Sequence, residues 1–346
     1  MKKMHRKYEL TRHNSFAFPA ICPAFYQPKT IQELNEIVPQ LSSPFYILGE
    51  GSNTLFTEQT TTAILQPNFK GISVTESNDF ALVTAKCGEN WHELVKFCVE
   101  NKLYGLENLA LIPGSVGAAP VQNIGAYGTE LADVIEYVSW YEFESSSLKK
   151  LDKKACQFAY RDSVFKNLLA NKGVIVEVTL RLSKKWQANL TYRGLDTLSE
   201  NASAKEVFQK VIEIRQSKLP DHVKLPNAGS FFKNPVVEDK LFVHLKATYP
   251  EMPAYLQNNG QVKLAAGWLI EKSGLKGYRI GAVGVDQTQA LVLVNYGSKV
   301  GQDILQLAKL VQDHVLKKFD ILLQPEVRLL SSQGLIQLSQ TKQAHY

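Results

Sequence analysis

The chain has 346 residues, of which 45% are hydrophobic and 21% are charged, a composition typical of a globular protein with a substantial core. The net charge of +6 is spread along the sequence apart from the basic residues 1–12, which does not favour a nucleic-acid-binding role. No apolar run reaches the roughly 18 residues of a membrane helix, and FAFPAICPAF is short and interrupted by Pro19 and Pro23, so we expect a cytoplasmic protein without membrane insertion.

The cysteines and histidines do not indicate a metal site. The four cysteines form no CxxC pair, and the seven histidines form no HxH or HxxxH pair. We therefore expect reduced, mostly buried thiols and no bound metal.

The first notable feature is ILGEGSNTLF at residues 47–56, where a short apolar strand runs into a turn with two glycines. A Rossmann fingerprint would need a third glycine where Thr54 stands and a helix after it, but β-branched threonines follow without a helical pattern. Two interpretations remain, a loop whose backbone N–H groups bind phosphate or a tight structural turn.

Residues 89–103 predict an amphipathic helix that is capped by Asn90 with Glu93. Its apolar face contains Trp91, Leu94, Val95 and Cys98. The next segment, residues 112–128, contains four glycines and is too long for a simple turn. Ordered loops of this length are usually functional, so we interpret the two glycine-containing loops as parts of one site for a large phosphate-bearing cofactor.

The remaining elements follow a mixed order of strands and helices rather than a regular βαβ repeat, which predicts an α+β fold. The helix from Ser203 has a capping partner in Glu206 and is a plausible hinge between the two halves of the chain. We expect the final residues from Ser331 to be frayed. The other expected elements are strands at 133–143, 173–182 (with Val174, Val176, Val178 and Leu180 alternating), 290–295 and 322–330, and helices at 262–274 and 303–318.

Six motifs in order resemble the UDP-N-acetylenolpyruvoylglucosamine reductase (MurB) family: GEGSN, IPGSVGAAPVQNIGAYG, YRDS, KLP, AGSFFKNP and QPEV. The resemblance extends from residues 14–16 to about residue 330. It is specific because the motifs occur together and in this order. It implies a two-lobed FAD-binding domain of the vanillyl-alcohol oxidase (PCMH) type, followed by a smaller α+β substrate-binding domain. The implied boundaries are 1–70 and 71–219 for the two lobes, 220–320 for the substrate-binding domain, and 321–346 for a strand that returns to the domain interface and then a tail.

The resemblance also implies a reaction. A flavoenzyme of this family would reduce the enolpyruvyl group of UDP-N-acetylglucosamine-enolpyruvate to UDP-N-acetylmuramate in peptidoglycan precursor synthesis. NADPH would reduce FAD and leave, and the UDP-sugar would enter the same cleft. Hydride would then pass from flavin N5 to C3, and a general acid would protonate C2. We expect the protein to be a monomer.

Three residues match the catalytic positions of the family. Arg161 matches the arginine that stabilises the enolate, and its planar guanidinium suits a carboxylate; the alternative is an ion pair with Asp162. Ser230 matches the proton donor; the alternative is a hydroxyl that satisfies a turn. Glu326 matches the third position, where it would hydrogen-bond near the carboxylate of the intermediate; the alternative is a strand-end residue paired with Arg328.

Four further residues match substrate-binding positions. Lys218 would contact the diphosphate or the pyridine nucleotide, and Asn234 would hydrogen-bond the substrate. Tyr160 would line the cleft. Tyr192 lies in a segment at about 186–200 that matches the tyrosine loop of the longer class, which folds over the UDP group. The corresponding structural alternatives are a solvated helix end, an Asn-Pro turn, core packing and a strand aromatic residue.

Twelve residues match flavin-binding positions. Those expected at the pyrophosphate are Gly49, Gly51, Ser52 and Asn53. Those expected around the rest of the cofactor are Pro113, Gly114, Ser115, Gly117, Ala118, Gln122 and Gly125, with Ile175 near the adenosine or isoalloxazine end.

The flavin would be bound without a covalent link, because no histidine lies between His13 and His92 to tether it. The main alternative is another non-covalent FAD oxidoreductase of the same fold. A non-catalytic nucleotide-binding regulator is less favoured, because Arg161, Ser230 and Glu326 are all present.

Overall fold

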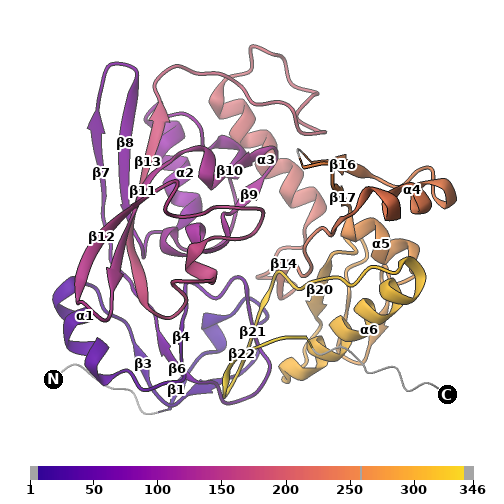
Figure 1. Ribbon diagram of the computed structural model, residues 1–346, viewed down its shortest axis with the longest axis horizontal. Coiled ribbons are helices and arrows are strands. Elements are labelled where there is room, and N and C mark those ends of the chain that lie inside the picture. Colours follow the sequence, from indigo (N-terminus) through magenta and orange to yellow (C-terminus); the bar gives the residue numbers. More distant parts are fainter. Residues whose placement is uncertain (1–6, 258, 339–346) are drawn as a thin grey trace. The chain divides into compact units, whose positions relative to one another are not determined.

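The computed structural model describes residues 7–257 and 259–338 (Figure 1). Contacts between residues divide the chain into two compact units. Among the described residues, unit 1 comprises 7–8, 22–52 and 62–217, and unit 2 comprises 9–21, 53–61, 218–257 and 259–338. The contacts thus group two short N-terminal segments with the C-terminal part of the chain. The domain boundaries expected from the sequence stay a prediction.

Unit 1 contains a five-stranded antiparallel sheet in the order β12-β11-β13-β8-β7, with β7 and β8 forming a long hairpin at one edge (Figure 1). Its strands are β7 (Ile72–Glu76), β8 (Phe80–Lys86), β11 (Ile135–Glu142), β12 (Ser147–Asp152) and β13 (Gly173–Ser183). Two helices share a hydrophobic cluster with β8 and β13, namely α2 (Trp91–Glu100) and α3 (Ala204–Lys218). The predicted capped helices are therefore confirmed, and the four apolar residues expected on one face of α2 are all buried.

The strand β13 differs from the simple alternation expected of it, because it is buried on both faces. Val174 and Val176 pack in one cluster with Leu34, whereas Ile175 and Val178 pack in the cluster of α2 and α3. Because both faces are covered, the sequence of such a strand is a nearly continuous apolar run instead of an alternation.

Unit 1 also contains a parallel three-stranded sheet, in the order β3-β6-β4, which leads into the first glycine-containing loop. Its strands are β3 (Phe25–Tyr26), β4 (Phe45–Ile47) and β6 (Ala63–Leu65), and the helix α1 (Ile31–Ile37) lies between β3 and β4 in the chain. A short hairpin begins in the last part of the second loop and consists of β9 (Gly125–Ala126) and β10 (Thr129–Glu130). The strands β1 (Tyr8–Glu9) and β2 (Ile21–Cys22) lie where the chain passes between the units.

In the part of unit 2 that the structure describes, there are three small sheets and three α-helices. The sheet β14-β20-β19-β18 comprises β14 (Asn227–Ser230), β18 (Arg279–Ile280), β19 (Val283–Val285) and β20 (Val292–Asn295). The sheet β15-β17-β16 comprises β15 (Val236–Val237), β16 (Ala254–Leu256) and β17 (Val262–Leu264). The sheet β22-β21-β5 comprises β5 (Thr54–Phe56), β21 (Arg328–Ser331) and β22 (Gly334–Ile336). The helices are α4 (Asp239–Thr248), α5 (Ala266–Lys272) and α6 (Gly301–Phe319).

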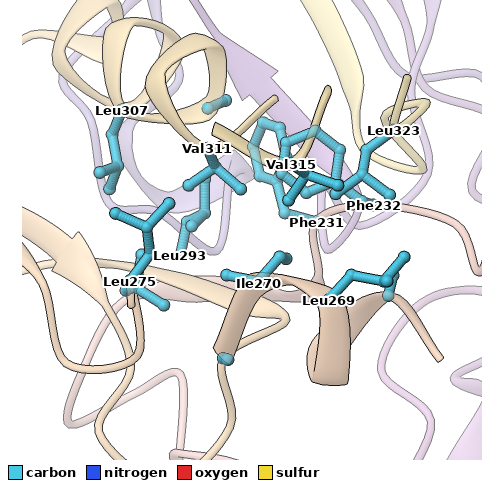
Figure 2. Close-up of a cluster of buried hydrophobic side chains, with 14 of the residues drawn as sticks. Phe231, Phe232, Leu269, Ile270, Leu275, Leu293, Leu307, Val311, Val315 and Leu323 are labelled. Atoms are coloured by element: carbon cyan, nitrogen blue, oxygen red, sulfur yellow. The ribbon is translucent and has the colours of Figure 1, made fainter. Parts of the chain in front are cut away.

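The core of unit 2 forms where α6 and α5 pack together with β20 and the Phe231–Phe232 segment (Figure 2). Leu307, Val311 and Val315 repeat at helical spacing on α6 and are fully buried. The helix predicted at 303–318 is therefore confirmed, with its apolar face as expected.

Three predictions in this half are wrong. The strand expected at 322–330 begins only at Arg328, as β21, because Pro325 before it makes no more than an isolated bridge to Phe232. Residues 262–264 belong to the strand β17 and not to the following helix, because α5 begins only at Ala266. Gly334–Ile336 are not frayed, because they pair with β21 as β22. Ser331 is the last residue of β21, and residues 339–346, which the expectation also covers, lie outside the described residues.

All four cysteines are free and buried, as expected. Burial raises the pKa of Cys22 and Cys87 to about 11 and that of Cys98 and Cys156 to about 12. Because the thiolate is the reactive species, we expect the native protein to react with Ellman's reagent at least about a hundredfold more slowly than the denatured chain, in which all four thiols react. A thiol that reacts rapidly in the native protein would contradict this prediction. In the part of the chain that the structure describes, no helix is long and apolar enough to cross a membrane.

Candidate cofactor and substrate site

The two glycine-containing loops lie against each other in unit 1. A Cβ atom added to Gly49 would be 3.0 Å from both the Oγ of Ser115 and the Cβ of Ala118. The Ser52 hydroxyl donates a hydrogen bond to the Pro113 carbonyl at 3.1 Å. Loops far apart in the sequence therefore form one continuous surface, and glycine at position 49 is what lets them approach.

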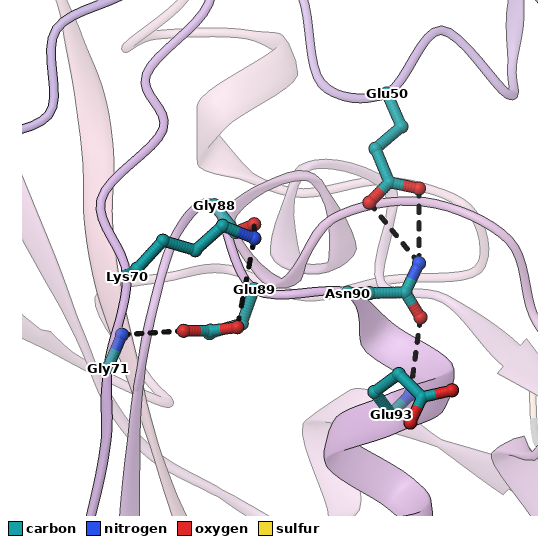
Figure 3. A network of polar contacts seen from close by, with 7 residues as sticks. All are labelled: Glu50, Lys70, Gly71, Gly88, Glu89, Asn90 and Glu93. Carbon is teal, nitrogen blue, oxygen red and sulfur yellow. Dashed lines mark hydrogen bonds and ion pairs between the residues drawn. The ribbon is translucent and has the colours of Figure 1, made fainter.

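The N-terminus of α2 holds both loops in place (Figure 3). The Asn90 side chain accepts the Glu93 N–H at 3.2 Å, as predicted for a cap, and its Nδ2 donates to the Glu50 carboxylate at 3.2 Å. The Trp91 N–H donates to the Gly114 carbonyl at 2.9 Å. Asn90 thus links the first loop to the helix cap, a role that the sequence did not reveal.

Glu89 adds a second connection in the same network (Figure 3). Its carbonyl accepts the Val116 N–H at 2.8 Å, and its carboxylate accepts the Gly71 N–H at 2.5 Å. The Lys70 ammonium lies 3.7 Å from the same carboxylate. These contacts attach the second loop to the edge of the five-stranded sheet.

Both loops have the bare backbone that a bound pyrophosphate requires. Gly51 has φ +75°, and Gly114 has φ +125° with its added Cβ 3.1 Å from the Ser52 Oγ. Such backbone can approach a ligand closely and present N–H groups to it. The residues present therefore fit the diphosphate of FAD. Gly117 has a different role, because its added Cβ would lie 2.5 Å from the Cβ of Cys87.

Arg161 lies against the second loop. Its Nη2 donates to the Gly125 carbonyl at 2.9 Å, and its guanidinium lies 5.3 Å from the centre of the Tyr160 ring. The Lys166 ammonium donates to the Arg161 carbonyl at 2.9 Å. Arg161 has φ +54°, a conformation that is uncommon for a residue with a side chain. The loop after Tyr160 thus directs the guanidinium toward the predicted cofactor-binding segment.

Ser230 and Glu326 lie on adjoining segments of unit 2. Ser230 ends β14, and the carbonyl of the next residue, Phe231, accepts the Glu326 N–H at 2.8 Å. An antiparallel bridge between Phe232 and Pro325 continues this pairing. Two of the three predicted catalytic residues, widely separated in sequence, are therefore brought together.

Asn53 joins the same part of unit 2. Its Nδ2 donates to the Glu326 carbonyl at 3.2 Å, and its own carbonyl accepts the Arg328 N–H at 3.0 Å. The pairing continues into the parallel strands β5 and β21. The first loop thus has Ser52 in unit 1 and Asn53 beside Glu326 in unit 2.

Other predicted site residues have visible structural roles. The Asn234 Oδ1 accepts the Ala266 N–H at 3.0 Å, at the start of α5. Ile175 is buried in the core on β13, opposite Trp140. Lys218 is the exposed last residue of α3, and Gln122 ends the 3₁₀ helix Val116–Gln122. Their assignments to substrate or flavin stay predictions.

Sequence analysis missed a buried polar cluster in unit 1. The Arg215 guanidinium hydrogen-bonds the Tyr127 phenol, and its Nε is buried without a partner. Burial lowers the pKa of Arg215, and the Tyr127 contact opposes this. The sequence could have indicated that Arg215 is buried. Arg215 lies eight residues after Val207 on α3, and therefore on the same helical face as the buried Val207 and Val211.

The comparisons with known proteins agree with this geometry. Residues 22–143 match the FAD binding domain model, and residues 221–330 match the C-terminal domain model of UDP-N-acetylenolpyruvoylglucosamine reductase. The fold and the glycine-containing loops thus define an FAD-binding protein, with an FAD-binding domain followed by a smaller α+β domain.

Curated relatives and a solved structure extend the likeness over most of the chain. A UDP-N-acetylenolpyruvoylglucosamine reductase from Shewanella oneidensis is 44% identical over 94% of this chain and 97% of its own length. The reductase from Pasteurella multocida is 46% identical over 84% of this chain and 86% of its own length. The crystal structure of the enzyme from Thermus caldophilus matches the fold with a TM-score of 0.67 at 22% identity, covering 95% of this chain and 99% of the other. The chain belongs to the UDP-N-acetylenolpyruvoylglucosamine reductase family.

Proposed function

We propose that this protein reduces the enolpyruvyl group of UDP-N-acetylglucosamine-enolpyruvate to UDP-N-acetylmuramate, with NADPH as reductant, during peptidoglycan precursor synthesis. The observation that carries the proposal is the hydrogen bond from the Glu326 N–H to the Phe231 carbonyl. This bond brings the backbone of Glu326 to the residue that follows Ser230, the predicted proton donor, and the match to the family over 94% of the chain supports the proposal.

The FAD would be held without a covalent bond by the two glycine-containing loops of unit 1. The first loop, Gly49 to Asn53, would bind the pyrophosphate through backbone N–H groups and the Ser52 and Asn53 side chains. The second loop, from Pro113 to Gly125, would surround the rest of the cofactor. When bound, FAD supplies the hydride chemistry that side chains lack.

The side chains would orient the substrate and move its proton. The Gly125 carbonyl accepts a hydrogen bond from the Arg161 guanidinium, and the planar guanidinium matches the geometry of a carboxylate. Arg161 would therefore bind the substrate carboxylate and stabilise the charge that develops on it. The Ser230 hydroxyl would protonate C2, and Glu326 would hydrogen-bond the carboxylate region.

The remaining predicted residues would bind the nucleotide parts of the ligands. Lys218 would contact the diphosphate or the pyridine nucleotide, and Tyr192 would pack on the UDP group. Tyr160 and Asn234 would line the substrate site. We further propose that NADPH and the UDP-sugar use one cleft in turn, and that the enzyme is a cytoplasmic monomer.

An anaerobic spectroscopic experiment tests the proposal. We expect the purified protein to be yellow, to release FAD on denaturation, to be bleached by NADPH, and to regain its colour with the UDP-enolpyruvyl sugar. A flavin-loaded sample that NADPH does not bleach would contradict the proposal. Bleaching by an alcohol or a sugar instead would support the alternative, another non-covalent FAD oxidoreductase of this fold.

A further inference from the structure

Asn108 joins two segments of unit 1 that are distant in sequence. It is 3% exposed and lies in the 3₁₀ helix Glu107–Leu109. Its Nδ2 donates to the Tyr127 carbonyl at 2.8 Å and to the Asn189 carbonyl at 3.0 Å. One buried amide group therefore connects the end of the second loop to the segment that bears Tyr192.

Asn189 strengthens the same connection from the other side. Its Nδ2 donates to the Gly128 carbonyl at 3.1 Å and to the Thr129 hydroxyl at 3.2 Å. Its Oδ1 accepts the Thr191 hydroxyl at 2.8 Å. The segment before Tyr192 is thus ordered internally and bound to the turn of the β9–β10 hairpin.

Close packing accompanies these hydrogen bonds. The Tyr192 ring meets the Tyr127 ring edge to face, with 4.8 Å between ring centres. Gly128 has φ +82°, and a Cβ added there would be 2.9 Å from the Thr191 hydroxyl oxygen. The hairpin turn and the tyrosine segment therefore fit together without space for an added side chain.

The same hairpin also holds Arg161. Its first residue, Gly125, accepts the hydrogen bond from the Arg161 guanidinium, whereas its turn carries the contacts to Asn189 and Tyr192. Only one short hairpin, Gly125–Glu130, separates the proposed carboxylate-binding residue from the proposed UDP-binding tyrosine.

We propose that Asn108 and Asn189 are positioning residues that dock the tyrosine segment, residues 186–200, on the β9–β10 hairpin in the conformation that binds the UDP-sugar. The inference rests on the proposed function, because Tyr192 contacts the UDP group there. Neither asparagine touches substrate in this proposal. Each acts by placing Tyr192 relative to the hairpin that holds Arg161.

The test uses the FAD-loaded variants Asn108→Ala, Asn189→Ala and Asn189→Asp. We expect the KM for the UDP-enolpyruvyl sugar to rise about tenfold, because each variant removes hydrogen bonds that fix the docked segment. The rate of FAD reduction by NADPH should stay at the wild-type value, and kcat should change much less than KM. Asn189→Asp keeps the acceptor for Thr191 but loses the donors to Gly128 and Thr129, so it should resemble Asn189→Ala.

A matched control and a double variant separate docking from general destabilisation. Asn101→Ala removes a side-chain amide that donates to the Phe97 carbonyl at 2.8 Å at the end of α2, and should leave KM unchanged. The double variant Asn108→Ala/Asn189→Ala should raise KM less than the product of the two single effects, because both act on one contact. Multiplicative effects, an unchanged KM or a lower KM would overturn the inference.

Limited trypsin cleavage tests the docking without any substrate. Arg193 is exposed within the tyrosine segment, and cleavage after it should be faster in the Asn189 variants than in the wild type and in Asn101→Ala. If the UDP-enolpyruvyl sugar does not reoxidise the reduced flavin of the wild type, the proposed function fails. The cleavage rates still test the docking of the tyrosine segment in that case. If Asn108→Ala does not fold, the two Asn189 variants decide the result, and cleavage at the wild-type rate in both overturns it.

Discussion

Replacement of Ser230 by alanine is expected to slow reoxidation of the reduced flavin by the UDP-enolpyruvyl sugar about a thousandfold, the usual contribution of a positioned general acid. Reduction of the flavin by NADPH should be nearly unchanged, because that step needs no proton at C2. The fold should survive, because the main-chain bonds around Ser230 remain, including that from Phe231 N–H to the Leu291 carbonyl at 2.8 Å. Anaerobic stopped-flow absorbance measures the two half-reactions separately.

Ser273→Ala is the matched control for this prediction. It removes a hydroxyl in the same unit, one that donates to the Leu269 carbonyl at 2.8 Å at the end of α5. We expect both half-reactions of this variant to match the wild type. Equal slowing of both half-reactions in Ser230→Ala would instead identify Ser230 as a structural or general cofactor contact.

Replacement of Gly117 by alanine is expected to weaken FAD binding about a hundredfold or more and to lower the melting temperature by several degrees. The new Cβ would lie 2.5 Å from the Cβ and 3.1 Å from the Cα of Cys87. Cys87 cannot yield easily, because its N–H donates to the Val176 carbonyl on β13 at 2.9 Å. The second loop must therefore move away from Cys87, which disturbs its fit against the first loop.

Gly267→Ala provides the control for the glycine substitution. Its added Cβ would lie 3.0 Å from the Oε1 of Gln289, the end of a flexible side chain that can rotate away, and alanine favours the helix α5. FAD content and melting temperature should be retained in this variant. Fluorescence titration of the apoprotein with FAD measures the dissociation constant of each variant. Wild-type affinity in Gly117→Ala would show that the loop position does not control the cofactor site.

Elements with a strong local pattern were predictable from the sequence. The helices α2 and α6 carry apolar residues at helical spacing, and their buried faces are those expected. Elements defined by distant partners were not. The three residues of β17 continue an apolar run into α5, and only pairing with β15 and β16 makes them a strand. Likewise β22, with only Gly334, Leu335 and Ile336, is too short to show a strand pattern and depends on β21.

The candidate site shows the same division between local and distant information. The order of its short motifs identified the family and predicted the catalytic residues, because the motifs are local features of the sequence. The polar contacts that support them were not visible. Asn108 and Asn90 read as ordinary loop and cap residues, yet each binds segments that approach only after folding.

The sequence by itself therefore determined the family, the cofactor class and the amphipathic helices, and it predicted Ser230, Arg161 and Glu326 as the catalytic residues. The tertiary structure alone decided that Gly49 meets Ser115 and Ala118, that Glu326 lies beside Ser230 through Phe231, and that Tyr192 rests on Tyr127. The physical reason is that backbone hydrogen bonds and side-chain packing between distant segments leave no periodic signal in the chain.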